Sequence, residues 1–530
     1  MKRNLRRLSA LLLSLLLTVS LAACGDSSTG SVGGGKLPTG GKPSGSQESD
    51  MPSGSEEKGY DDSLITETVS LDTSFKNEYG ETCQVSIHLP QLSSNGAKTL
   101  NQRIMDIWGD LAAKKQADFE RECLAVTVGW ESHWSGSLLS LVMTEEQPGI
   151  GPDYWVFHYD FAKEQEVSAG ELLDQLGISE DTLRIALCRA AANGFDGIFS
   201  DGRTAAPEEL ALLRAKTLAA AADAVHDLPF YPNADGSLTA YLNICTPVAA
   251  GWSQWELNIP LTRQAAPLRT EADDVAVTVN ADETVEVLIE KGSRTEAYQE
   301  EYGFRCGESY PIDGCYGNYK KLLVASVGPD DCPTLFLLTD SGTVEYVRLF
   351  DAFRFGKLVN HGPLYGVGVP EGLWGDWPEV VDFEAGAGEH ISTVYAVMSD
   401  GSRYDLAEAV NTGGTLRPFD LSGSWEAFLT RPGSSASEYR MEIQPSGSFT
   451  ELTFTDSIPG AGISVSYTGY LEYLGMNETG LLYGYTVTGP DGNDLVGTMA
   501  LLPQDGAMMV TPAGGDALLD APDGLQFVKD

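Results

Sequence analysis

The sequence has few basic residues, and their scarcity excludes one large class of partners. The chain of 530 residues contains 34 lysines and arginines against 76 aspartates and glutamates, which gives a net charge of -42. A surface this acidic repels phosphate backbones, so we expect no nucleic acid partner.

The sequence also lacks the signatures of common catalytic chemistry. It contains no Gly-x-Ser-x-Gly elbow, no Walker A loop, no His-Glu-x-x-His and no Cys-x-x-Cys pair. We therefore expect neither a metal nor a cofactor, and a protein that is not an enzyme. A wall-modifying hydrolase remains an alternative, because a pair of carboxylates ~5–9 Å apart cannot be recognised in a sequence.

The N-terminus has the layout of a secretory signal peptide over residues 1–23. Basic residues lead into an apolar stretch from Leu11 to Leu21, which is too short for an ordinary transmembrane helix. The following residues, Leu21-Ala22-Ala23-Cys24, resemble the lipobox of bacterial lipoproteins. That resemblance implies lipid attachment to Cys24, and two acyl chains at ~0.8 kcal/mol per buried methylene hold a protein stably on a membrane. An ordinary cleaved signal with an incidental Cys24 is the alternative.

A Gly/Ser/Pro-rich stretch covers residues 24–62 and has almost no apolar side chains. Such a segment cannot bury enough surface to fold, so we predict a disordered tether. A tether of this kind is common in lipoproteins of Gram-positive bacteria. The expected location is the outer face of the cell membrane.

Residues 64–270 mix strand and helix patterns and predict an α+β domain. Residues 83–89 alternate like a strand, and the apolar residues from Leu100 to Leu111 follow helical spacing. Further helices are expected from Ser179 and from Pro207, and Asp235-Gly236 predicts a hairpin turn. Helices packed against an antiparallel sheet would form this domain.

Several short segments of this domain resemble one extracytoplasmic family. They are HLPQL, KTLNQRIMDIW, SLLSLVM, YDFAKEQEVSAGELL, FYPNADGSLTAYLN and WELNIPL, in that order. The family is similar to the domain found on lysozyme-sensing anti-sigma factors and before peptidoglycan deacetylase domains, and it has no enzymatic assignment of its own. This chain departs from the family at residues 148–153, where relatives carry a histidine-containing turn and this sequence has none.

The remaining chain reads mostly as strands. Residues 271–415 predict a mostly-β domain, in which 334–349 and 393–406 resemble two copies of one hairpin. Residues 416–530 show regular short strands with glycine-containing turns, which predicts a small antiparallel barrel. The opening Gly423-Ser424-Trp425 resembles the first strand of lipocalin-like barrels, and a small-ligand carrier is therefore another alternative function. The whole chain is thus expected to be multidomain, with an α+β domain followed by mostly-β domains.

Seven cysteines follow Cys24, and an odd number outside the cytoplasm leaves at least one thiol unpaired. Cys306 and Cys315 lie nine positions apart around a turn and could form a disulfide that closes a loop.

Aromatic residues give the best indication of a recognition surface. Trp130, Trp134, Tyr154 and Trp155 are expected on neighbouring strands or turns of the first domain, and flat rings stack on sugars or anchor protein partners. Packing in the core is the alternative role for them. We predict a non-catalytic binding or sensing module for a cell-wall glycan or a cationic secreted protein, since the acidic surface complements a basic one.

Overall fold

The computed structural model describes most of the chain from Tyr60 onward. The described residues are 60–199, 205–247, 251–261, 267–327, 332–350, 353, 355, 358–364, 367, 379–388, 390–413, 421–430, 436–446, 449–504 and 507–530. The predicted signal peptide, Cys24 and nearly all of the predicted tether lie outside them. The chain divides into a unit of residues 1–61 and a unit of residues 62–530, and every described helix and strand belongs to the second unit.

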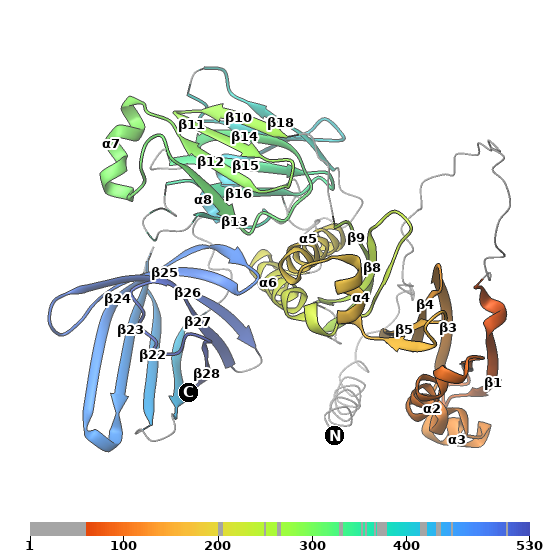
Figure 1. Ribbon diagram of the computed structural model, residues 1–530. Coiled ribbons are helices and arrows are strands. Elements are labelled where there is room, and N and C mark those ends of the chain that lie inside the picture. The colour runs from red at the N-terminus through yellow and green to blue at the C-terminus, as the bar shows by residue number, and fades with distance from the viewer. Residues whose placement is uncertain are drawn as a thin grey trace. The chain divides into compact units, whose positions relative to one another are not determined.

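A six-stranded sheet opens the second unit, drawn in red to orange in Figure 1. Its strands follow one another in sequence order, and all neighbours are antiparallel except β2 and β3. The parallel pair needs a crossover, and helices α2 and α3 provide it. The elements are β1 (Ile65–Lys76), β2 (Thr82–Leu92), α2 (Lys98–Ala112), α3 (Gln116–Glu122), β3 (Val126–Ser135), β4 (Leu138–Gln147), β5 (Ile150–Asp160) and β6 (Gln165–Val167).

Helix α2 forms where the apolar periodicity predicted a helix. Leu100, Ile104 and Trp108 recur every four positions and are at most 1% exposed. This spacing puts all three side chains on one face, and burial of that face provides most of the stability of such a helix.

Three helices and a second sheet complete the mixed region. The sheet has the order β7-β8-β9, and the apolar faces of α4, α5 and the end of α6 pack against Leu238, Ala240 and Leu242 of β8. A capping box starts α4, because Ser168 and Glu171 each accept a hydrogen bond from the other's backbone N–H. The elements are α4 (Ala169–Leu176), α5 (Glu180–Phe199), α6 (Pro207–Asp223), β7 (Phe230–Pro232), β8 (Leu238–Cys245) and β9 (Trp252–Ile259).

The middle of the chain forms three small sheets. They have the orders β10-β11-β12-β13-β17, β14-β15-β16 and β18-β19-β20. Both hairpins expected from the sequence are present, as β15–β16 and β19–β20, and their apolar faces share one buried cluster. The elements are β10 (Leu268–Ala272), β11 (Val275–Val279), β12 (Val285–Ile289), α7 (Ser293–Tyr302), β13 (Ser309–Asp313), β14 (Tyr319–Val327), β15 (Cys332–Thr339), β16 (Val344–Arg348), β17 (Leu358–Val359), β18 (Val380–Ala385), β19 (Val394–Met398), β20 (Arg403–Asp405) and α8 (Leu406–Gly413).

The C-terminal strands close into an eight-stranded antiparallel barrel, drawn in blue in Figure 1. Alternate side chains point inward, and they form a continuous apolar cluster that includes Trp425, Phe454, Tyr485 and Phe527. The predicted barrel is confirmed, and so is the fold class of mixed α and β followed by mostly β. The strands are β21 (Gly423–Leu429), β22 (Ser437–Ser446), β23 (Phe449–Ile458), β24 (Ile463–Asn477), β25 (Gly480–Thr488), β26 (Asp494–Gln504), β27 (Ala507–Gly515) and β28 (Leu525–Lys529).

Candidate functional site

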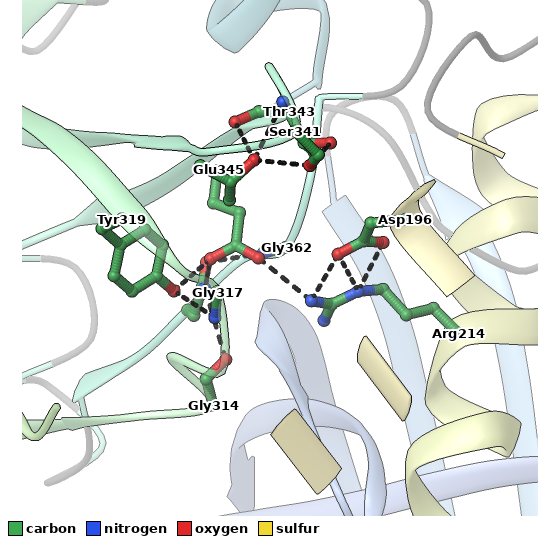
Figure 2. Close-up of polar contacts among 11 residues, drawn as sticks. Asp196, Arg214, Gly314, Gly317, Tyr319, Ser341, Thr343, Glu345 and Gly362 are labelled. Carbon is green, nitrogen blue, oxygen red and sulfur yellow. Dashed lines mark hydrogen bonds and ion pairs between the residues drawn. The ribbon is translucent and has the colours of Figure 1, made fainter. Parts of the chain in front are cut away.

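A buried ionic network joins the helices of the mixed region to the middle sheets. Figure 2 shows Arg214 of α6 between Asp196 of α5 and Glu345 of β16. The Arg214 guanidinium donates from Nε to Asp196 Oδ1 at 3.0 Å, and from Nη2 to Asp196 Oδ2 at 2.9 Å and to Glu345 Oε1 at 3.0 Å. Two carboxylates therefore share one guanidinium.

Further donors surround Glu345. The Tyr319 hydroxyl and the Asn360 side-chain amide both donate to Glu345 Oε2. Burial raises the pKa of Glu345, while Arg214 beside it acts in the opposite direction. Asp196, Arg214 and Glu345 are each at most 1% exposed, so the network is closed to a substrate and serves to join chain segments.

A second polar group lies where the faces of the first two sheets meet and reaches solvent. We call it the aromatic–acidic seam, and its members are Glu131 and His133 of β3, Tyr154 of β5, Tyr231 of β7, Tyr241 of β8 and Glu256 of β9. Strand register explains the first three, because Glu131, His133 and Tyr154 all lie on the same face of the first sheet.

Two stacked ring pairs form the seam. The rings of His133 and Tyr231 lie 3.7 Å apart between centroids with planes 12° apart, and those of Tyr154 and Tyr241 lie 4.0 Å apart with planes 16° apart. Tyr231 and Tyr241 are buried, whereas His133 and Tyr154 are half-buried. Each stack thus has an inner ring that is fixed by packing and an outer ring that solvent can reach.

Exposed carboxylates accompany the rings. The Glu131 side chain is 77% exposed, and Glu256 is exposed on β9. Burial raises the pKa of Tyr154, Tyr231 and Tyr241, and the charge of Glu256 raises each of them further. The phenols are therefore neutral near pH 7, and the negative charge of the seam resides on the glutamates.

The charge state of His133 follows from the same surroundings. Burial lowers the pKa of His133, although Glu131 and Glu256 oppose that shift. A neutral imidazole stacked on a phenol, next to carboxylates, is an arrangement that attracts a cation to ring faces and to negative charge together.

The four aromatic residues predicted from the sequence do not form one surface. Trp130 and Trp155 flank Met143 across three neighbouring strands, on the face opposite to Tyr154. There the Trp155 ring packs edge-on against Trp108 of α2, with centroids 5.1 Å apart. Of the four residues, only Tyr154 belongs to the seam.

Trp134 has another role that the structure makes visible. Its indole N–H donates to Asp62 Oδ1 at 2.8 Å, and the Ser132 hydroxyl donates to the same oxygen. Asp62 is the first residue of the second unit and begins a short 3-10 helix (Asp62–Leu64). Trp134 thus holds Asp62, the first residue of the second unit, against β3.

Of the seam, the sequence predicted only Tyr154, and it missed the other five members: Glu131, His133, Tyr231, Tyr241 and Glu256. The signal available in the sequence was the Asp235-Gly236 turn. This turn pairs Tyr231 with Thr239, so Tyr241 lies two residues further along the second strand of the same hairpin. The sequence alone does not indicate that this hairpin packs against Tyr154.

The cysteine pairing stays a prediction. Cys306 and Cys315 are free thiols in the structure, and both pack against the same apolar cluster of the middle region. Among the residues that the structure describes, no group of three or more histidine, cysteine or acidic side chains is arranged to hold a metal.

Comparisons with known proteins leave the family open. No protein-family description matches the chain, and no curated protein matches it. The resemblance of residues 64–265 to the lysozyme-sensing family therefore remains a prediction. Within the described part of the chain, no helix is long and apolar enough to cross a membrane.

Proposed function

We propose that this chain is a non-catalytic protein, lipid-anchored on the outer face of the cell membrane, that binds a cationic secreted protein through the aromatic–acidic seam. The observation that supports the proposal best is the pairing of two outer rings, His133 and Tyr154, with two exposed carboxylates, Glu131 and Glu256. A lysine or arginine side chain matches both parts, since its charge pairs with carboxylates while its stem or guanidinium lies on a ring.

The charge of the whole chain favours the same kind of partner. A net charge of -42 accelerates the encounter with a basic protein and repels acidic ones. The rings alone would also suit a wall glycan, but stacking on sugars does not need the two glutamates. We therefore place the cationic protein before the glycan.

A titration of the full chain with lysozyme tests this proposal. The variant Glu131→Gln/Glu256→Gln should weaken binding by about tenfold, because it removes the charges beside the rings while it keeps their shape. The matched control Glu120→Gln/Glu451→Gln removes two exposed charges elsewhere and should change the affinity by less than about threefold.

Two results would contradict the proposal. Equal losses in both double variants would mean that lysozyme responds to overall charge and not to the seam. Binding of isolated wall fragments that exceeds binding of lysozyme, and that survives loss of both seam glutamates, would identify a glycan as the partner.

The anchor is tested separately at Cys24. Cys24→Ser should release the protein from the membrane fraction, because the predicted lipid is attached through that thiol. The affinity of Cys24→Ser for lysozyme should be unchanged. If Cys24→Ser stays on the membrane, that result would contradict the lipid anchor.

The proposal also concerns the type of the C-terminal barrel. Its eight strands, the first opening with Gly423-Ser424-Trp425, are lipocalin-like. The Trp425 ring is 3% exposed, and its N–H donates to the Leu421 carbonyl at 3.0 Å, which supports a role in closing one end of the barrel.

A further inference from the structure

The inside of the C-terminal barrel holds a carboxylate among apolar side chains. Leu452 and Phe454 of β23 belong to the barrel core, and Asp456 follows them on the same face of the strand. Its cross-strand neighbours are Tyr439 on β22 and Val465 on β24. The side chain of Asp456 therefore points inward, near the end of the barrel where β23 ends.

One oxygen of this carboxylate is left without a donor. Asp456 Oδ1 is buried, and among the residues that the structure describes none donates a hydrogen bond to it. Burial raises the pKa of Asp456, and the negative charge of Asp520 raises it further. Buried carboxylate oxygens normally accept a hydrogen bond. An oxygen without one, among apolar side chains, therefore suggests that a bound molecule supplies the donor.

The surroundings are apolar but not sealed. Half-buried side chains pack against the core here, and they include Leu429, Tyr467, Leu495 and Leu518. Leu519 and Ala521, which follow β27, are buried in the same core, while Asp520 between them is exposed. Solvent thus reaches the chain directly beside Asp456, which is itself half-buried although its Oδ1 is covered.

We propose that this end of the barrel binds an organic cation, with an ammonium group donating to Asp456 Oδ1 and an apolar body lying against Leu429, Tyr467 and Leu495. The ammonium supplies both the missing donor and the opposite charge, and the apolar body replaces water on the half-buried wall. This site lies on β23 and its neighbours and is independent of the aromatic–acidic seam, so it goes beyond the function proposed above.

Calorimetric titration of the full chain with three matched probes tests the site. The probes are 2-phenylethylamine, 2-phenylethanol and 3-phenylpropanoate, which share an apolar ring and differ in the charge of the polar end. The amine should bind about tenfold more tightly than the alcohol, since a hydrogen bond between charged groups exceeds one with a neutral donor, and the carboxylate should not bind.

Two variants of one strand separate the site from general charge. Asp456→Asn should remove the preference for the amine, whereas Glu451→Gln, an exposed position on the same strand and the opposite face, should retain it. Equal binding of amine and alcohol by the unaltered protein would overturn the proposal, because a neutral donor or water would then satisfy Asp456 as well. Loss of amine binding in Glu451→Gln to the same extent as in Asp456→Asn would overturn it too.

Discussion

The network around Arg214 and the aromatic–acidic seam both contain glutamate and tyrosine side chains, but in opposite settings. In the network, Arg214, Asp196 and Glu345 are almost completely buried, and each charge meets a partner from another element. In the seam, Glu131 and Glu256 are exposed beside partly accessible rings.

This difference shows that exposure to water determines whether a charged group stabilises the fold or stays available to a partner. Charges removed from water must be paired internally, so they fix the arrangement of the segments that provide them. Charges left in water cost little and remain available to a partner. In a chain with 76 acidic residues, carboxylates alone do not single out a site, so the proposed recognition site rests on glutamates that are exposed beside aromatic rings.

The largest expected effect concerns Arg214, whose replacement tests the contrast between buried and exposed charges. Arg214→Met leaves Asp196 and Glu345 buried without their cation, so we expect the free energy of unfolding to fall by about 3–5 kcal/mol. Chemical denaturation followed by tryptophan fluorescence measures the change. Arg184→Met, which removes an arginine paired with Glu180 on the surface of α5, should cost no more than about 0.5 kcal/mol, and a similar loss in both variants would contradict the contrast.

A smaller effect is expected when the charge of Glu345 is removed without a change of shape. Because burial raises the pKa of Glu345 above its ordinary value of 4.5, the folded state binds its proton more readily than the unfolded state does. The stability that this group contributes is then present below pH 4.5 and is lost as the pH rises through the folded pKa. Glu345→Gln should therefore gain stability relative to the unaltered protein as the pH rises above 4.5, as measured by denaturation midpoints.

The control for that experiment is Glu451→Gln, on an exposed strand position of the barrel. Its stability difference from the unaltered protein should not follow the same course with pH. A Glu345→Gln difference that is flat, or that moves in the opposite direction, would show that Arg214 outweighs burial in setting the pKa of Glu345.

In the seam, loss of an outer ring should affect binding more than folding. Tyr154→Leu keeps an apolar side chain over Tyr241 but removes the ring that faces the cation, so lysozyme should bind about threefold to tenfold more weakly. Tyr79→Leu, at a position 76% exposed in the β1–β2 turn, is the matched control and should leave the affinity unchanged. Equal affinities for all three proteins would remove Tyr154 from the site.

The smallest effect concerns the charge of His133. Burial lowers the pKa of His133 below its ordinary value of 6.5, so the imidazole remains neutral when the pH falls from 8 to 7. Lysozyme binding at constant ionic strength should then change by less than about twofold over that interval. A steep loss of affinity in that range, absent in His133→Gln, would mean that His133 becomes protonated and repels the cation.

Local patterns in the sequence predicted the elements well where neighbours along the chain determine them. The spacing of Leu100, Ile104 and Trp108 predicted α2, and the strand-and-turn rhythm after residue 416 predicted the barrel. Both patterns depend on which side of a single helix or strand is apolar, and that property can be recognised from residues that are close together in the sequence.

The site could be predicted only in part. Tyr154 is an aromatic residue of the first domain that belongs to the site, but Trp130 and Trp155 are aromatic residues of the same domain and lie on the other face of the sheet. Alternation along a strand tells which residues share a face, and it does not tell which face meets a second sheet.

The sequence by itself determined the acidity of this protein, the lipobox-like segment that ends at Cys24, the helix α2 and the rhythm of the barrel strands. Only the tertiary structure decided that Arg214 meets Glu345, 131 positions away, and that Tyr154 stacks on Tyr241. The physical reason is that helices and strands follow from interactions between near neighbours, whereas these contacts depend on how whole elements pack against one another to bury their apolar faces.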